Sequence, residues 1–284
     1  MAGLTPMMQQ YMETKKQYKD CILFYRLGDF YEMFFEDAIT ASRELEITLT
    51  GKDCGLEERA PMCGIPFHAV DGYLNRLVSK GYKVAICEQV EDPKLAKGIV
   101  KREVIRIVTP GTNLNTQALE ESKNNYLMCI ACFQNRIGVS IVDVTTGDFY
   151  MTEVEGLAKL QDEIYKYMPT EIICNDAFVM SGYDIEDLKG RLGMAVYTLE
   201  PWYFDDDGCR KCLMNHFKVN TLAGLGLEDF PSGMISAGAA MQYLLETQKT
   251  DLTHINHIIP YLASRFMLLD SSTRRNLELT ETLR

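Results

Sequence analysis

The sequence lacks the features that mark several classes of protein. Its apolar runs stop well short of the roughly 18 residues that a membrane span needs, and no basic-then-apolar leader opens the chain. Basic residues are also in deficit, with 29 Lys and Arg against 40 Asp and Glu and a net charge of −11. We therefore expect a cytoplasmic protein without a membrane span, and a binder of nucleic acid through bulk basic charge is disfavoured.

Charge and cysteine add two constraints. Residues 1–110 hold 15 basic and 16 acidic residues, whereas residues 111–284 hold 14 basic and 24 acidic residues. The two parts are therefore expected to do different jobs, and a local basic surface on the first remains compatible with nucleic-acid binding. Nine cysteines, an odd number spread over apolar stretches, indicate buried thiols in a reducing compartment.

The first 112 residues mix helix and strand signals, which predicts a small mixed α/β domain. Helices are expected over residues 7–17, 29–45 and 69–80, and strands over residues 21–26, 47–49, 82–89 and 101–108. Residues 51–61 are polar and predict a loop, and residues 61–68, with two prolines and a glycine, predict an irregular extended segment.

A second α/β domain is predicted over residues 125–245, after a polar linker at 113–124. Three strands in hairpin order (125–133, 138–145 and 147–154) precede a helix at 157–167 and a strand at 171–174. This order is typical of a ribonuclease-H-like α/β domain. From residue 246 we expect the start of an all-α domain, and the chain stops at Arg284 in what looks like the first turns of a helix, as a piece of a longer protein would.

The segment 28–34 (Gly-Asp-Phe-Tyr-Glu-Met-Phe) is the most specific stretch of the chain. Phe24, Phe34 and Phe35 are expected in the core. Phe30 and Glu32 lie two residues apart at the start of the expected helix, where both side chains can point outward. An exposed aromatic ring beside a carboxylate can wedge between stacked bases while the carboxylate accepts a hydrogen bond from a base edge. The alternative is that both belong to an ordinary helix start.

Six motifs together resemble the MutS family of DNA mismatch-recognition proteins. They lie at residues 5–11 (Thr-Pro-Met-Met-Gln-Gln-Tyr), 28–34, 61–69 (Pro-Met-Cys-Gly-Ile-Pro-Phe-His-Ala), 84–89, 106–112 and 270–277. The resemblance implies a mismatch-recognition domain at 1–112, a ribonuclease-H-like connector domain at 125–245 and the start of a helical core or lever domain at 246–284.

The resemblance also implies what this chain does not carry. The family's ATPase, with its ATP and Mg²⁺, lies beyond Arg284, so no enzyme activity and no cofactor are expected of these residues. The phosphate-binding pattern Gly-x-x-x-x-Gly-Lys-Ser/Thr is missing, because Gly51-Lys52 is followed by Asp53. The implied partners are mismatched double-stranded DNA, the protein MutL and a second copy of the full-length protein.

In the family the aromatic residue of a Phe-x-Glu pair stacks on a mispaired base from the minor groove, which by position is Phe30. Glu32 would contact the displaced base and, as a carboxylate near phosphates, penalise intact duplex. A mismatch is already poorly stacked, so wedging there costs less free energy than in paired DNA.

Other residues of the first domain are candidates for contacts with the DNA backbone or groove. Lys52 and Arg102 match positions that are basic in the family, and Arg76 and Lys80 lie on the expected third helix. The segment 62–68 resembles a loop that follows the minor groove, through the residues Met62, Gly64, Ile65, Pro66 and His68. The alternatives are solvated surface charges and a structural turn.

Two catalytic or metal hypotheses and one binding alternative remain open. A ribonuclease-H-like nuclease would use Asp143 and Asp148, although strand-end carboxylates exposed to solvent are the simpler explanation. Cys209, Cys212 and His216 have part of the spacing of a zinc site without an evident fourth ligand. Alternatively, the chain mainly mediates protein contacts and binds MutL without a preference for mismatches.

Overall fold

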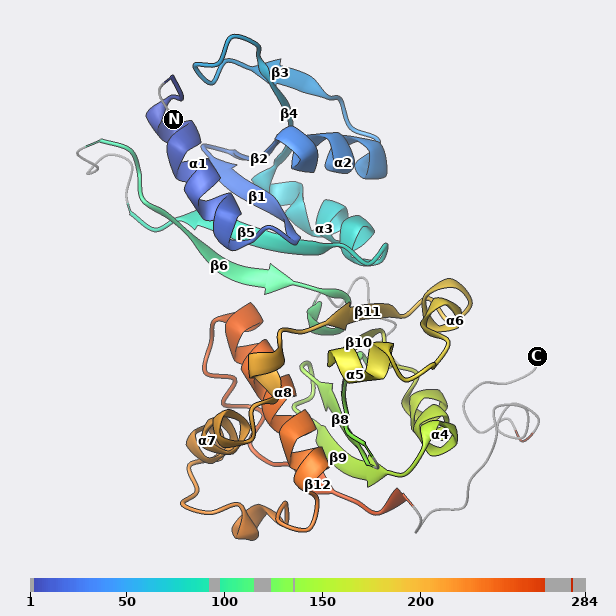
Figure 1. Ribbon diagram of the computed structural model, residues 1–284. Helices are drawn as coiled ribbons and strands as arrows, with labels where there is room; N and C mark the ends of the chain where they lie inside the picture. Colours follow the sequence, from blue (N-terminus) through green and yellow to red (C-terminus); the bar gives the residue numbers. More distant parts are fainter. Residues whose placement is uncertain (1–2, 92–97, 115–123, 135, 264–276, 278–284) are drawn as a thin grey trace. The chain divides into compact units, whose positions relative to one another are not determined.

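The computed structural model describes residues 3–91, 98–114, 124–134, 136–263 and 277. The chain divides into two units, residues 1–121 with 247–249 and residues 122–246 with 250–284. Among the described residues each unit contains a sheet of six strands flanked by helices (Figure 1). In this described part no helix is both long enough and apolar enough to cross a membrane.

The first unit has a mixed sheet in the order β3-β4-β2-β1-β5-β6. Its strands are β1 (Cys21–Leu27), β2 (Phe30–Phe34), β3 (Thr50–Lys52), β4 (Ala60–Pro66), β5 (Lys83–Gln89) and β6 (Arg102–Val108). Its helices are α1 (Pro6–Gln17), α2 (Phe35–Leu45) and α3 (Val70–Val78). Strands β1 and β5 are parallel, and the other neighbours are antiparallel.

Both faces of this sheet are covered, which explains why residues 21–25 of β1 are a continuous apolar run. Successive side chains of a strand point to opposite faces. Ile22 and Phe24 accordingly join the cluster under α2 and α3, whereas Leu23 and Tyr25 join the cluster under α1. The predicted helices at 7–17 and 69–80 and the strands at 21–26, 82–89 and 101–108 are confirmed within a few residues at their ends.

The helix predicted over residues 29–45 is wrong in its first part. Residues 30–34 form β2, which pairs with both β1 and β4, and the helix begins only at Phe35. Gly28, with φ +57°, opens a two-residue turn between paired residues Leu27 and Phe30, a position that suits glycine in a tight hairpin. The aromatic residues of this stretch therefore serve a strand, where they are favoured.

Two further predictions in this unit are wrong. Residues 61–66, expected to be irregular, belong to the regular strand β4, which tolerates its prolines because they lie at or next to its ends. The strand expected at 47–49 is instead β3 at Thr50–Lys52, so Lys52 lies on a strand and not in the predicted loop.

The second unit has the sheet order β11-β10-β7-β8-β9-β12. Its strands are β7 (Tyr126–Cys132), β8 (Ile137–Asp143), β9 (Phe149–Val154), β10 (Glu171–Cys174), β11 (Ala195–Thr198) and β12 (Ile259–Pro260). Its helices are α4 (Leu157–Tyr167), α5 (Asp176–Val179), α6 (Ile185–Gly190), α7 (Asp206–Phe217) and α8 (Pro231–Gln248). Strands β7, β8 and β9 form an antiparallel meander, β10 lies parallel to β7, and β11 lies parallel to β10.

The predicted meander, the helix at 157–167 and the strand at 171–174 are confirmed. Helix α8 packs very closely on β8, where a Cβ added to Gly138 would lie 1.9 Å from the carbonyl oxygen of Ser232. It also packs closely on α7, where a Cβ on Gly238 would lie 2.3 Å from the Cβ of Cys209. Glycine at these two positions lets the backbones approach.

Helix α8 continues across the predicted boundary at residue 245, and β12 then adds to the sheet beside β9. The helical domain expected at 246–284 falls largely on residues 264–276 and 278–284, which lie outside the described residues. The same holds for residues 115–123 of the predicted linker.

Candidate functional site

Strand β2 carries Phe30 and Glu32 on one face of the first sheet, because residues two apart on a strand point the same way. Phe34 shares this face and is buried under α1 with 1% of its surface exposed, whereas Phe30, at the other end of the strand, is 48% exposed. The two residues therefore share one face of a strand, and the helix start on which the sequence analysis placed them is wrong.

The carboxylate of Glu32 is held by an ion pair in this structure. The Nζ atom of Lys52, on β3, lies 2.5 Å from Oε2 of Glu32 and 5.7 Å from the centre of the Phe34 ring. The side chain of Lys52 is 34% exposed and that of Glu32 is 16% exposed. The pair joins two strands that β4 separates, so it lies on top of the sheet surface beside Phe30.

Strand β4 supplies the floor between these side chains. Gly64 pairs with Glu32, and Pro66 pairs with Phe30. A Cβ on Gly64 would lie 3.6 Å from Cγ of Glu32 and 3.9 Å from Cδ1 of Phe30. Phe30, Glu32, Lys52, Gly64 and Pro66 thus form one surface, called here the Phe30 face.

Three other residues of the predicted groove segment lie in different surroundings. Met62 is partly buried in the cluster under α1. Ile65 is fully buried in the cluster under α2 and α3, so its predicted contact with the groove is wrong. His68 is exposed in the short turn Phe67–Ala69, with its ring edge-on to Phe67.

The remaining predicted cations are not gathered on the Phe30 face. Arg102 donates to the carbonyl oxygen of Arg26 at 2.7 Å and to Oε1 of Gln10 at 3.0 Å, and so ties β6 to β1 and α1. Arg76 and Lys80 pair with Glu46 and Glu44, respectively, beside α2 and α3. These helices cover the opposite face of the sheet.

Sequence reasoning missed a cation beside the turn that precedes Phe30. The guanidinium carbon of Arg26 lies 3.8 Å from the centre of the Phe67 ring. The sequence offered one signal: Arg26 lies two residues after Phe24 in an apolar strand and two residues before Gly28.

The carboxylates considered for a nuclease are not arranged for catalysis. Asp143 is fully buried, not exposed as expected, and it accepts hydrogen bonds from the backbone of Thr145 and Asn125 and from the side chain of Asn124. Asp148 accepts from Thr146. Among the residues that the structure describes, no three His, Cys, Asp or Glu side chains gather closely enough to hold a metal ion.

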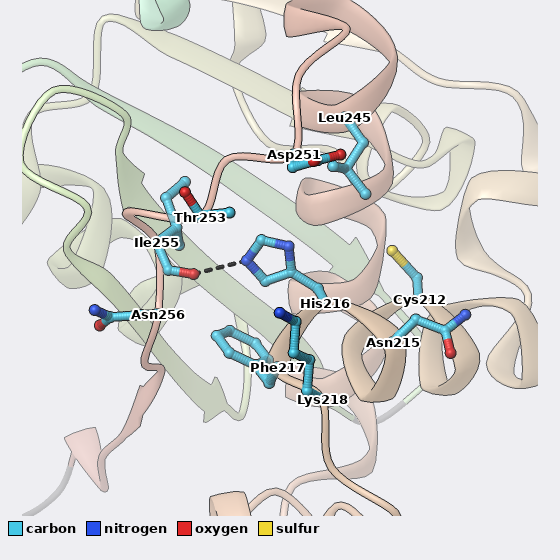
Figure 2. Close-up of a pocket in the computed structure, with 10 residues that line it drawn as sticks. All are labelled: Cys212, Asn215, His216, Phe217, Lys218, Leu245, Asp251, Thr253, Ile255 and Asn256. Carbon is cyan, nitrogen blue, oxygen red and sulfur yellow. Dashed lines mark hydrogen bonds between the residues drawn. The ribbon is translucent and has the colours of Figure 1, made fainter.

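The three residues considered for a zinc site lie in different surroundings. Cys209 is buried, and its thiol donates to the carbonyl oxygen of Tyr203. Cys212 and His216 line a hollow of about 560 Å³ between α7, Leu245 and the segment 251–256 (Figure 2). His216 Nε2 lies 2.7 Å from the carbonyl oxygen of Ile255. Burial raises the pKa of Cys209 to about 12 and that of Cys212 to about 11, which favours thiols over metal-binding thiolates.

Both units match known protein families. Residues 5–117 match the family model of MutS domain I, and residues 125–256 match that of MutS domain II. The chain is 68% identical over 284 residues to the DNA mismatch repair protein MutS of Lachnoclostridium phytofermentans, covering 100% of this chain and 30% of that protein. It is 55% identical over 287 residues to the MutS of Ruminiclostridium cellulolyticum, covering 100% of this chain and 32% of that protein.

The molecule is thus a two-unit α/β protein with a half-exposed aromatic side chain and a paired carboxylate on one sheet face. The chain belongs to the MutS family, and it consists of the family's domains I and II with a short segment beyond them. It spans about a third of the length of the relatives it matches.

Proposed function

We propose that this chain is the mismatch-sensing part of a DNA mismatch repair protein. The observation that carries the proposal is the Phe30 face, where Phe30, a residue that is 48% exposed, stands beside an ion-paired carboxylate. Large aromatic side chains are usually buried on folding, so a ring left in solvent on an ordered strand is available to stack on a base.

The Phe30 ring enters the minor groove and stacks on a mispaired or unpaired base. Unstacking a base step costs a few kcal/mol, and base–aromatic stacking returns roughly 1–3 kcal/mol. The balance is favourable where the base is already poorly stacked, so selectivity comes from deformability and not from a particular base sequence.

Glu32 and Lys52 act together in this proposal. In the free protein Lys52 compensates the charge of Glu32 at 2.5 Å. When Glu32 turns to the displaced base, the ammonium group becomes available to a phosphate. On a perfect duplex no displaced base offers a hydrogen bond, so the carboxylate near phosphates is a net cost.

The second unit serves as a connector in this proposal. The order β9-β8-β7-β10-β11, an antiparallel meander followed by two parallel strands, supports a ribonuclease-H-like fold. Asp143, which is buried and already accepts hydrogen bonds from Asn124, Asn125 and Thr145, gives no support to a nuclease. We assign to this unit the relay to an ATPase and the contact with MutL. We assign the binding of ATP and Mg²⁺ and the formation of a homodimer to the part of the full-length protein that this chain does not span. The proposed location is the cytoplasm, with the DNA.

The test uses the full-length protein and a duplex with one G·T mismatch or one unpaired base, compared with its perfect match at one stated salt concentration. Phe30→Ala is expected to lose most of the preference, a change of roughly 5- to 150-fold, which corresponds to the stacking free energy. Phe133→Ala, at a phenylalanine of the second unit that is 38% exposed, should keep the preference. If Phe30→Ala also keeps the preference, Phe30 is not the wedge and the proposal fails.

A further inference from the structure

Four side chains under the turn before Phe30 have no part in the function proposed above. They are Arg26, Tyr31, Phe67 and Glu88, called here the turn clamp. The Arg26 guanidinium carbon lies 3.8 Å from the centre of the Phe67 ring and 5.6 Å from that of Tyr31. The Arg26 side chain is only 16% exposed, so this cation is largely shielded from solvent by the rings and the turn.

Hydrogen bonds connect the turn clamp to the backbone of both turn residues. Arg26 Nε donates to the carbonyl oxygen of Gly28 at 2.5 Å, and the backbone N–H of Phe67 donates to the carbonyl oxygen of Asp29 at 2.9 Å. Both carbonyl groups of the turn are therefore fixed, that of Gly28 by a side chain of the hairpin itself and that of Asp29 from outside the hairpin.

Glu88 on β5 anchors the cation. Its Oε1 atom lies 3.4 Å from Nη1 of Arg26 and accepts a hydrogen bond from the phenol of Tyr31. Burial, together with the hydrogen bond to Glu88 and its charge, raises the pKa of Tyr31, so the phenol stays protonated and remains a donor. The clamp thus reaches from β5 through β1 to the turn.

The geometry places the clamp and the wedge on opposite sides of one strand. Tyr31 points into the cluster under α2 and α3, and its neighbour Phe30 points to the other face, in keeping with strand alternation. The clamp therefore grips the backbone from one side and leaves the Phe30 ring free on the other.

We propose that Arg26 is a positioning residue that holds the turn so that the Phe30 ring is presented to DNA in one orientation. This inference rests on the proposed function. A ring that is ordered before binding loses less conformational entropy on contact, so more of the stacking free energy appears as affinity. Lysine would not replace arginine here. The planar guanidinium of Arg26 lies over the Phe67 ring while the Nε of the same group donates to the carbonyl oxygen of Gly28, and a lysine side chain has no such planar group.

The experiment measures the ratio of the dissociation constants for perfect and mismatched duplex in the full-length protein. Arg26→Lys keeps the charge but loses the stacking plane and the Nε donor, and we expect the ratio to fall about threefold to tenfold. Arg43→Lys is the matched control, because Arg43 is on the same unit with a side chain that is 67% exposed, and it should leave the ratio unchanged. An unchanged ratio in Arg26→Lys overturns the inference.

A second arm tests whether Arg26 acts through Phe30. In the Phe30→Ala background, Arg26→Lys should cause no further fall, because the residue it positions is gone. If Arg26→Lys instead weakens both duplexes equally in either background, Arg26 contacts phosphate directly and the inference is wrong. Should Arg26→Lys fold poorly in thermal unfolding, Tyr31→Phe removes only the phenol donor to Glu88, and a ratio unchanged in that variant rejects the clamp.

Failure of the proposed function gives a different result. If Phe30→Ala by itself keeps the preference for mismatched DNA, the wedge is rejected, and the positioning role of Arg26 falls with it. If Phe30→Ala loses the preference and Arg26→Lys keeps it, the wedge stands and only the positioning role is rejected.

Discussion

Glu32 of the first unit and Asp143 of the second are both strand carboxylates, and their surroundings differ. Glu32 pairs with Lys52 beside the half-exposed Phe30, and the Glu32 side chain is 16% exposed. Asp143 is fully buried and accepts hydrogen bonds from the backbone and side chains of residues 124, 125 and 145. A buried carboxylate with several donors is fixed in place, whereas one paired with a single lysine near the surface can exchange its partner.

Two strand glycines show the same difference between the units. Gly138 of β8 makes room for the backbone of α8, with the Ser232 carbonyl oxygen 1.9 Å from where a Cβ would be. At Gly64 of β4 the nearest atoms would be 3.4 Å or more from a Cβ, an ordinary contact distance. The second unit uses glycine for close packing, and the first uses it as the floor of the Phe30 face.

The largest expected effect is at Gly138. Gly138→Ala should lower the free energy of unfolding by about 3 kcal/mol or more, because a methyl group cannot fit against a backbone carbonyl without moving α8. Gly64→Ala should change it by less than about 1 kcal/mol. Urea unfolding of the two variants, followed by circular dichroism, measures both. Equal losses would remove the contrast between packing and surface glycines.

A somewhat smaller effect is expected at Asp143. Asp143→Ala should cost about 1–3 kcal/mol of unfolding free energy, since it leaves the buried N–H of Asn125 and the donors of Asn124 and Thr145 without their acceptor. Asp148→Ala, which loses the bond from Thr146 in a more exposed position, should cost no more than about 1 kcal/mol. A stable Asp143→Ala protein would mean that this carboxylate is not structural, and would reopen the question of its role.

The sequence predicts correctly those helices and strands whose hydrophobic pattern lies within their own residues. Helix α4 runs over residues 157–167, as its apolar spacing indicates. The apolar positions of residues 29–45 suit a helix face, yet residues 30–34 form strand β2. Its pairing with β4, 28 to 36 residues further on, decides the outcome, and nothing within residues 29–34 indicates that pairing.

The candidate site was predictable to a similar extent. The family motif indicated Phe30 and Glu32. Strand alternation places both side chains on one face, as the predicted helix start would also have done. The ion pair with Lys52 depends on the order of β3, β4 and β2, which the sequence did not reveal. The turn clamp depends on Phe67 and Glu88, both far from Arg26 along the chain, so only the folded sheet brings them together.

The smallest expected effect tests whether Glu32 is as exchangeable as its surroundings suggest. In binding of perfect duplex at low salt, Lys52→Gln should weaken affinity, since it removes a cation and leaves Glu32 uncompensated near phosphates. In a Glu32→Gln background the same change should cost less, with a coupling of about 0.5–1 kcal/mol, as for a partly exposed ion pair. Lys80→Gln, which breaks a pair with Glu44 beside α2, should show no coupling to Glu32→Gln. Purely additive effects of Lys52→Gln and Glu32→Gln would mean that the pair does not govern how the Phe30 face meets DNA. A coupling of several kcal/mol would place Glu32 in a fixed network like that of Asp143.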